Sequence, residues 1–292
     1  MGLWIAMAGR KGGCGTSTLA RNVAVFLSQV GKRTALVDLC PGLSGVEAFS
    51  GADGFREDGT VAGSPRVQSG LHDLVLYFAT GDGQALVDEL GRAVDRGDHD
   101  AIVSDMRWDG SSLVSAVFRS APVRILVTAP DPVSVRELYA CASAVVLDEV
   151  AAAAPGVGSL VAGLGGGDTI AGFPSPRDLM ERAGPGGITD AVMAVIGRFR
   201  IGVVVNLATE REDRDLGRAV ESVGTRIFAL PLVDMGSVER DEAIAAAQRR
   251  RIPLLVHTPY SKAGHDVEAL VRRLLGTPDV DRIQPRIELA RL

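Results

Sequence analysis

The stretch that decides the fold is GRKGGCGTSTLARN, residues 9–22, which directly follows the apolar run LWIAMA at residues 3–8. A buried strand, a glycine-rich loop and a helix in this order are typical of a phosphate-binding loop. Glycines let backbone N–H groups converge on phosphate oxygens, and the helix N-terminus adds partial positive charge. The common motif G-x-x-x-x-G-K-[ST] has a lysine after its last glycine and then a hydroxyl residue for magnesium. Here these two positions hold Thr16 and Ser17.

The rest of the chain alternates short apolar runs with helical patterns, which is typical of a parallel sheet covered on both faces. Helical spacing predicts helices over residues 142–154 and 239–251, and a closing helix with one apolar face from Val267 to Leu275. We therefore predict an α/β fold with a doubly wound, mainly parallel sheet and helices on both faces. The strand candidates are residues 3–8, 34–39, 99–105, 123–130, 201–206 and 226–232.

Two segments interrupt this alternation. Residues 50–70 are rich in glycine, serine and charge, which predicts a flexible surface loop. Residues 155–190 predict a Gly-rich insert, with a long connection followed by a small helical part. The GLGGGD at 163–168 follows a helix and lacks the final glycine of a dinucleotide-binding motif, so we interpret it as loop. The economical interpretation is one domain over residues 1–292.

Composition narrows the function classes. A net charge of −5 gives no general attraction to nucleic acid or anionic lipid. The three cysteines, Cys14, Cys40 and Cys141, are an odd number without C-x-x-C spacing, which argues against a disulfide framework and against a zinc site. No apolar run approaches the ~18 residues needed to span a bilayer. We therefore expect a cytoplasmic protein.

The loop is more specific than its glycines alone. KGGCGTST at 11–18 resembles the deviant phosphate loop K-G-G-V-G-K-T-T of the MinD/ParA family, in which a second, "signature" lysine precedes the first glycine pair. Lys11 matches that lysine. Gly12, Gly13 and Gly15 match the loop glycines, and Ser17 matches the hydroxyl on the magnesium side.

The resemblance covers nearly the whole chain. Asp38 and Pro41 match the family's second motif, and Asp105 ends a strand similar to its third. The VVVN that ends at Asn206 is similar to the strand whose Asn reads adenine in that family. The C-terminal stretch at 248–275 looks most like the branch of flagellar-number regulators and their relatives.

The resemblance implies a face-to-face homodimer that closes over two ATP molecules, with Lys11 of each subunit reaching the other's phosphates. Such proteins are spatial switches whose ATP-bound dimer engages a membrane, DNA or a protein partner. By this resemblance Lys11 and Asp38 are catalytic, Asp38 and Asp105 join Ser17 at Mg²⁺, and Asn206 binds adenine. The residues implied for ATP or ADP in the loop are Gly12, Gly13, Cys14, Gly15, Thr16, Ser17 and Thr18.

The resemblance also implies cytoplasmic localisation, with peripheral binding at the membrane or nucleoid as an option. Residues 249–292 hold nine Lys or Arg against five Asp or Glu. Family members use such a basic surface for nonspecific DNA or a terminal helix for membrane, but we interpret this one as an ordinary solvated face.

Two departures from the family motif affect the chemistry. Thr16 replaces the loop lysine, whose charged hydrogen bond would contribute about 1.5–3 kcal/mol to phosphate binding. Cys40 replaces the second aspartate of D-x-D, which helps to place the attacking water, and a thiol is a weak acceptor. In addition, Arg107 and Trp108 stand where the family has a small turn, which predicts altered geometry beside the phosphate. Asp109 is a candidate to replace the missing carboxylate.

The leading hypothesis is a MinD/ParA-like spatial or assembly regulator that binds nucleotide weakly and hydrolyses it slowly or not at all, a pseudo-ATPase. One alternative is an active ATPase in which Arg10 or Lys11 supplies the missing charge. Another is a nucleotide-independent interaction scaffold. A metabolite kinase or ATP-dependent ligase has no substrate-binding residues in the sequence to support it.

Overall fold

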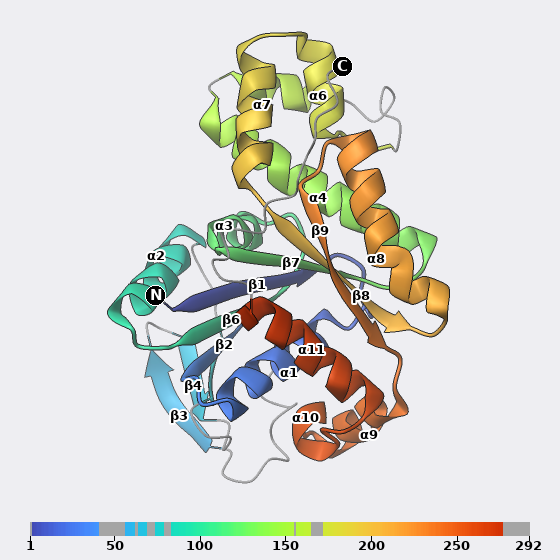
Figure 1. Ribbon diagram of the computed structural model, residues 1–292. Coiled ribbons are helices and arrows are strands. Elements are labelled where there is room, and N and C mark those ends of the chain that lie inside the picture. The colour runs from blue at the N-terminus through green and yellow to red at the C-terminus, as the bar shows by residue number, and fades with distance from the viewer. Residues whose placement is uncertain are drawn as a thin grey trace.

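The computed structural model describes residues 2–40, 56–61, 64–68, 74–78, 83–154, 156–164 and 172–276. In this part of the chain, nine strands form one sheet in the order β3-β4-β5-β2-β6-β1-β7-β8-β9 (Figure 1). All neighbouring pairs from β5 to β9 in this order are parallel, whereas the pairs β3–β4 and β4–β5 are antiparallel. The strands are β1 (Leu3–Gly9), β2 (Thr34–Asp38), β3 (Arg56–Val61), β4 (Ser64–Gln68), β5 (Leu74–Phe78), β6 (Ala101–Arg107), β7 (Val123–Thr128), β8 (Ile201–Ala208) and β9 (Leu232–Glu239).

Strand β1 lies at the centre because both of its faces are apolar. Trp4, Ala6 and Ala8 join one hydrophobic cluster, and Ile5 and Met7 join the other, as the two-residue period of a strand requires. After β1 the chain forms β2 on one side of β1. It later forms β6, between β2 and β1, and then crosses to form β7 on the other side of β1. Ligands bind at such switch points, beside the carboxyl ends of the strands. The loop after β1 therefore lies at the edge where a ligand is expected.

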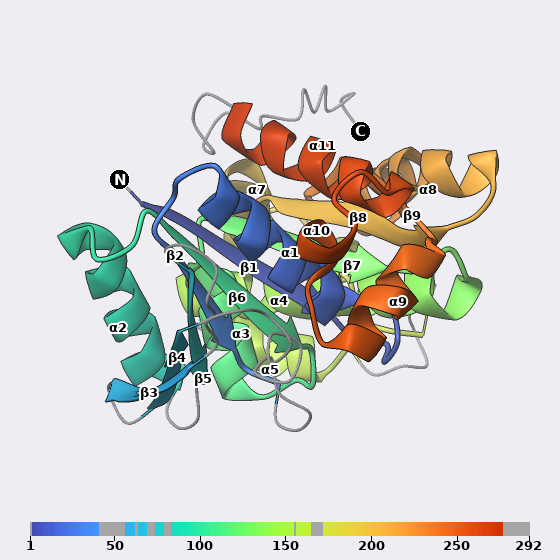
Figure 2. The same cartoon turned by 90° about the horizontal axis from the view of Figure 1, so that it is seen from below.

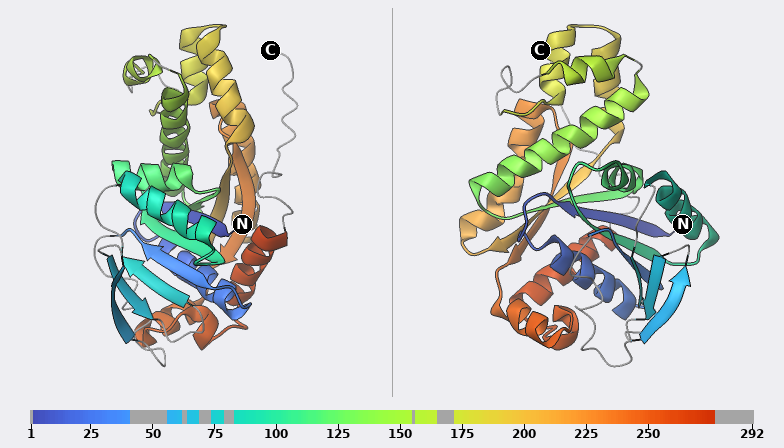
Figure 3. Two further views of the ribbon diagram at one scale, coloured as in Figure 1. Left: turned by 90° about the vertical axis from the view of Figure 1, so that its left-hand side faces the viewer. Right: turned by 180° about the vertical axis from the view of Figure 1, so that it is seen from behind.

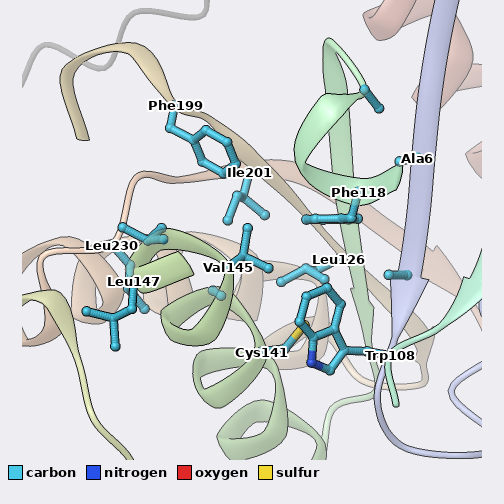
Figure 4. Packing of buried hydrophobic residues seen from close by; sticks show 14 of the residues in the cluster. Ala6, Trp108, Phe118, Leu126, Cys141, Val145, Leu147, Phe199, Ile201 and Leu230 are labelled. Atoms are coloured by element: carbon cyan, nitrogen blue, oxygen red, sulfur yellow. The ribbon is translucent and has the colours of Figure 1, made fainter. Parts of the chain in front are cut away.

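Helices cover both faces of the sheet (Figures 1 and 2). On one face, α1 (Thr16–Gln29) packs against α11 (Lys262–Gly276), beside α9 (Glu242–Arg250) and α10 (Leu254–His257). The opposite cluster takes buried side chains from α2 (Gly83–Arg96), α3 (Ser112–Ser120), α4 (Pro132–Ala153) and α8 (Arg211–Val223). Figure 4 labels Trp108, Phe118 and Cys141 among the buried side chains of that cluster. No described helix is both long enough and apolar enough to cross a membrane.

A group of helices projects from one end of the sheet. The 22-residue helix α4 extends past the strands, and α5 (Val157–Ala162), α6 (Pro176–Ala183) and α7 (Gly187–Arg198) pack around its far half (Figure 3). Helix α6 begins with a capping box between Ser175 and Asp178. The sequence predicted a helical part within the Gly-rich insert at 155–190, and the described residues contain it. Residues 155 and 165–171 lie outside the described part.

Two sequence predictions of local structure were wrong. Residues 56–61 and 64–68, expected within a flexible loop, are strands that extend the sheet at its edge. Residues 64–68 pair with β5 and residues 56–61 pair with β4, and such backbone pairing does not require apolar side chains. The remainder of 50–70 lies outside the described residues. The apolar run 226–232 was expected to be a strand. Instead, residues Gly224–Phe228 form one wide helical turn, Ala229 adopts a left-handed φ of 56°, and β9 begins only at Leu232. A short apolar run does not distinguish a buried turn of helix from a strand.

Candidate functional site

The glycine-rich loop connects β1, which ends at Gly9, to α1, which begins at Thr16. It borders a cavity of about 720 Å³ whose lining also includes Cys40, after β2, and residues 106–110 at the end of β6. The cavity therefore lies at the carboxyl edge of the three central strands β1, β2 and β6, as the topology predicts.

The loop backbone has the conformation that a phosphate cradle requires. Gly13 and Gly15 have φ angles of 87° and 82°, a region that residues with a Cβ rarely adopt. Apart from each glycine and its two chain neighbours, no atom of the described residues lies within 4 Å of the point where a Cβ on Gly12 or Gly13 would be. The first hydrogen bond of α1 runs from Leu19 N to Gly15 O, so the N–H groups of the first turn remain available to an anion.

Gly15 gives a testable consequence of this packing. A Cβ there would overlap Nδ2 of Asn206, whereas Gly31 has nearly the same φ, 82°, and open space around it among the described residues. We expect Gly31→Ala to lower the free energy of unfolding by about 1 kcal/mol, the cost of a left-handed residue. Gly15→Ala should cost at least ~1–2 kcal/mol more because it also displaces a buried amide. Urea unfolding of both variants measures the difference, and equal losses would contradict the close packing of Asn206 under the loop.

Thr16 does not take over the role of a lysine. Its side chain is buried, with 8% exposure, and its Oγ1 lies 3.2 Å from Sγ of Cys14. A Cβ on Gly9 would overlap the same hydroxyl, so Thr16 packs against the end of β1. The position that carries the loop lysine in the MinD/ParA motif therefore supplies no positive charge.

The two cations beside the loop are paired with acids of α4 in the same chain. Nζ of Lys11 lies 2.9 Å and 3.0 Å from the carboxylate oxygens of Asp131, and Nε of Arg10 lies 2.6 Å from Oε2 of Glu137. Asp131 is also the N-cap of α4 and accepts hydrogen bonds from N and Oγ of Ser134. The Ser134 hydrogen bonds, followed by the Lys11 ammonium, lower the pKa of Asp131 to about 2. Both loop cations are thus directed toward α4.

Two buried aspartates lie behind the cavity lining, next to Ser17 and Cys40, which line the cavity. Asp38 and Asp105 are register partners on β2 and β6, and Ser17 Oγ donates to Oδ1 of Asp105 at 3.1 Å. Burial, followed by the negative charge of Asp38, raises the pKa of Asp105 to about 7. Oδ2 of Asp105 is buried and has no hydrogen-bond partner among the described residues. An unpartnered buried carboxylate oxygen fits a cation, so these residues fit a divalent ion such as Mg²⁺.

Cys40 forms a cluster with these two aspartates. Its thiol and the Asp38 and Asp105 carboxylates offer ligand atoms that all lie within 4.8 Å of one another. Burial, followed by the negative charges of Asp105 and Asp38, raises the pKa of the Cys40 thiol to about 12. The thiol is therefore protonated near neutral pH, where it cannot orient a water molecule as a carboxylate does.

The residues after Asp105 differ from the sequence expectation. Trp108 is not a bulky group on the rim. It is 5% exposed, and its ring meets Phe118 edge-on with centroids 5.9 Å apart in the core (Figure 4). Its backbone N donates to Gly9 O at 3.0 Å, which joins the end of β6 to the loop. Asp109, the candidate replacement carboxylate, instead accepts from the backbone N of Ser111 at 2.8 Å. Only Arg107 of the expected pair is exposed.

Asn206 lies beneath the loop. It is 2% exposed, and its Nδ2 donates to the carbonyl of Cys14 at 2.8 Å. Its Oδ1 is buried without a partner among the described residues. Across the loop, Thr18 Oγ1 accepts a hydrogen bond from Nε2 of Gln248 in α9 at 3.2 Å. Asn206 thus supports the loop from β8. A nucleotide base in the cavity would contact Asn206 only if the base reached this buried side chain.

Sequence reasoning missed the acidic partners on α4. The pattern D-P-x-S at Asp131 is a helix start signal and could have identified the N-cap. The pairing with Lys11 spans 120 residues and has no local signal. Pro41, part of the resemblance, lies outside the described residues.

The comparisons with known proteins agree with this architecture. Residues 5–254 match the profile of the CobQ/CobB/MinD/ParA nucleotide binding domain. The septum site-determining protein MinD of Pyrococcus horikoshii, complexed with Mg-ADP, is similar with a TM-score of 0.61 and 16% identity, over 98% of this chain and 100% of that one. The cell division ATPase MinD of Pyrococcus furiosus has a TM-score of 0.59 and 18% identity, over 94% and 99%. A ParA family ATPase from Chlorobium tepidum has a TM-score of 0.56 and 15% identity, over 93% and 99%.

At such low identities, likeness to solved structures establishes the fold alone. A comparison with curated protein sequences gave no match. The resemblance and the doubly wound fold predicted from the sequence are both confirmed. Because the profile spans 5–254 of 292 residues, the chain belongs to the CobQ/CobB/MinD/ParA family of nucleotide binding domains.

Proposed function

We propose that this protein is a MinD/ParA-like spatial or assembly regulator that binds ATP or ADP with Mg²⁺ and hydrolyses ATP slowly or not at all. One observation carries the proposal. The loop keeps a backbone that is shaped for phosphate at the start of α1, whereas Thr16 packs against Cys14 and supplies no charge. Nucleotide binding depends mainly on the first feature and hydrolysis depends strongly on the second.

The assignment of residues follows the geometry of the cavity. Backbone N–H groups from Gly12 to Thr18 are proposed to hold the phosphates. Ser17, Asp38 and Asp105 lie where they would hold Mg²⁺, which when bound neutralises phosphate charge. Asn206 is proposed to read adenine because it lies near the end of β8 beside the loop, and its Oδ1, which has no partner among the described residues, is an acceptor for an amino group.

Impaired hydrolysis follows from two missing groups. Phosphoryl transfer needs positive charge at the transferred group and a residue that positions the attacking water. Thr16 lacks the charge, and the protonated thiol of Cys40 is a weak acceptor. The alternative of an active ATPase requires Arg10 or Lys11 to leave its partner on α4. With saturating Mg-ATP we expect phosphate release at the background rate. Release well above background that is lost in Lys11→Ala or Arg10→Ala would establish the alternative.

Assembly is part of the proposal. A solved MinC:MinD cell division protein complex from Aquifex aeolicus is similar in fold to this chain. We propose a homodimer that forms around nucleotide and recruits a protein partner, with binding to membrane or nonspecific DNA as weaker possibilities. The branch of flagellar-number regulators and the cytoplasmic location stay predictions. A scaffold that dimerises equally well without nucleotide is the competing possibility.

The ion pair between Lys11 and Asp131 makes dimerisation testable. Exposed pairs of this kind contribute about 0.2–1 kcal/mol, so Asp131→Asn should strengthen ATP-dependent dimerisation by up to about fivefold. Asparagine retains an oxygen that can cap α4. Lys11→Ala should abolish the ATP-dependent dimer if Lys11 crosses to the partner's phosphates.

Sedimentation analysis with ATP, with ADP and without nucleotide measures both effects. Lys32→Ala is the matched control, because it removes an exposed lysine that follows the far end of α1. A Lys11→Ala protein that dimerises with ATP as well as the natural protein does would contradict the proposed crossing. Equal dimerisation with and without nucleotide would favour the scaffold.

A further inference from the structure

We propose that Asp38, Cys40 and Asp105 together bind a thiophilic divalent cation, of the class of Zn²⁺, Co²⁺ and Cd²⁺, directly and in preference to Mg²⁺. The binding itself does not depend on nucleotide. Its significance for phosphate chemistry rests on the proposed function, because the ion would lie next to Ser17, which lines the cavity beside the loop.

The three ligands are already gathered by the sheet. Asp38 and Asp105 end neighbouring parallel strands and are register partners, and Cys40 follows Asp38 by two residues. Their donor atoms all lie within 4.8 Å of one another. A tetrahedral ion with ligands at about 2.0–2.3 Å holds its donor atoms about 3.3–3.8 Å apart. Side-chain rotations that draw the three donor atoms closer together would close the site.

A second observation also indicates a ligand at this position. Asp105 is 1% exposed and its Oδ2 has no hydrogen-bond partner among the described residues, although its Oδ1 accepts from Ser17. Leaving a buried carboxylate oxygen unpaired beside a second carboxylate is unfavourable. A divalent cation would satisfy that oxygen and offset the repulsion between Asp38 and Asp105.

The thiol decides which class of ion fits best. Mg²⁺ prefers near-octahedral oxygen ligands and keeps several waters, whereas cysteine sulfur selects ions such as Zn²⁺. A coordinating thiol gives up its proton to solvent when the metal binds. Three protein ligands leave a fourth position of a tetrahedral ion open, as in catalytic zinc sites. Since Cys40 and Ser17 both line the cavity, that open position would face the space proposed for phosphate.

Cobalt absorption tests this proposal in the full-length protein without nucleotide. The chelator-treated, thiol-reduced protein is titrated with Co²⁺ in the presence of millimolar Mg²⁺. We expect a near-ultraviolet thiolate-to-cobalt charge-transfer band that saturates at one equivalent and disappears when Zn²⁺ is added. Cys40→Ser should remove the band. Asp105→Asn should lower Co²⁺ affinity by more than about tenfold, because loss of a residue that only hydrogen-bonds to a metal ligand already lowers affinity by about that factor.

Cys141→Ala is the matched control, because it removes a buried thiol from the α4 core and should keep the band. Circular dichroism checks that each variant is folded. No band in the natural protein, a band of equal strength in Cys40→Ser, or a band that forms only when Mg²⁺ is left out would each overturn the proposal. Because the titration contains no nucleotide, its failure is independent of a failure to bind ATP.

Discussion

Thr16→Lys is expected to raise the affinity of the protein for ATP with Mg²⁺ by about ten- to a hundredfold. A hydrogen bond from a charged group contributes about 1.5–3 kcal/mol, and each 1.4 kcal/mol is a factor of ten in binding. Residue 16 begins α1, directly after the left-handed Gly15, so its side chain starts at the position where phosphate is expected. Calorimetric titration of the natural and variant proteins measures the change.

Thr16→Met separates charge from side-chain length. Methionine has a similar unbranched stem and, like lysine, gives up the contact of the Thr16 hydroxyl with Cys14, but it adds no charge. We expect no gain in ATP affinity for this control. An equal gain in both variants would mean that packing, and not charge, limits binding. The rate of ATP hydrolysis should be higher in the double variant Thr16→Lys with Cys40→Asp than in either single variant, because only the double variant restores both missing groups.

Asp105→Asn is expected to stabilise the nucleotide-free protein at alkaline pH. The pKa of Asp105 is raised from 3.8 to about 7, so the native state holds its proton at pH values where the unfolded state has lost it. The native protein therefore has its full stability with respect to this group below pH 3.8. The free energy of unfolding then falls as the pH rises from 3.8 to about 7. A shift of about three units corresponds to ~4 kcal/mol. The variant should gain about this amount at pH 8 and less than half of it at pH 5.

Urea unfolding at the two pH values measures this gain. The matched control is Asp100→Asn, because Arg33 lowers the pKa of Asp100 to about 2, the opposite direction. That carboxylate contributes stability above its unfolded pKa, so its substitution should lower stability at pH 8. If Asp105→Asn lowers stability at pH 8, the ionised Asp105 does not destabilise the nucleotide-free protein, and the prediction is wrong.

Sequence reasoning predicted the parts of this molecule that are encoded locally. The run at 3–8 and the glycines that follow it specify strand, loop and helix within twenty residues, and the register of parallel strands then brings Asp38 to Asp105. The spacing of those two residues along the chain carries no such information by itself. It became predictive through the resemblance to a known family, whose motifs mark both aspartates.

The misses share a physical origin in tertiary contacts. Trp108 follows Asp105 closely in sequence, but Phe118 and the core of α4 provide a buried site that holds its ring in the core. The strand at 64–68 is specified by its pairing with β5 and not by its own composition. The pairing of Lys11 with Asp131, 120 residues away, likewise depends on the fold and has no local signal.

The central claim is that an intact phosphate-binding loop keeps nucleotide affinity without the loop lysine. Calorimetric titration of the natural protein with ATP and with ADP in the presence of Mg²⁺, repeated on Thr16→Lys, tests it most directly. We predict saturable binding by the natural protein and tighter binding by the variant. No binding by either protein would contradict the account and show that the cavity beside the loop is not a nucleotide site.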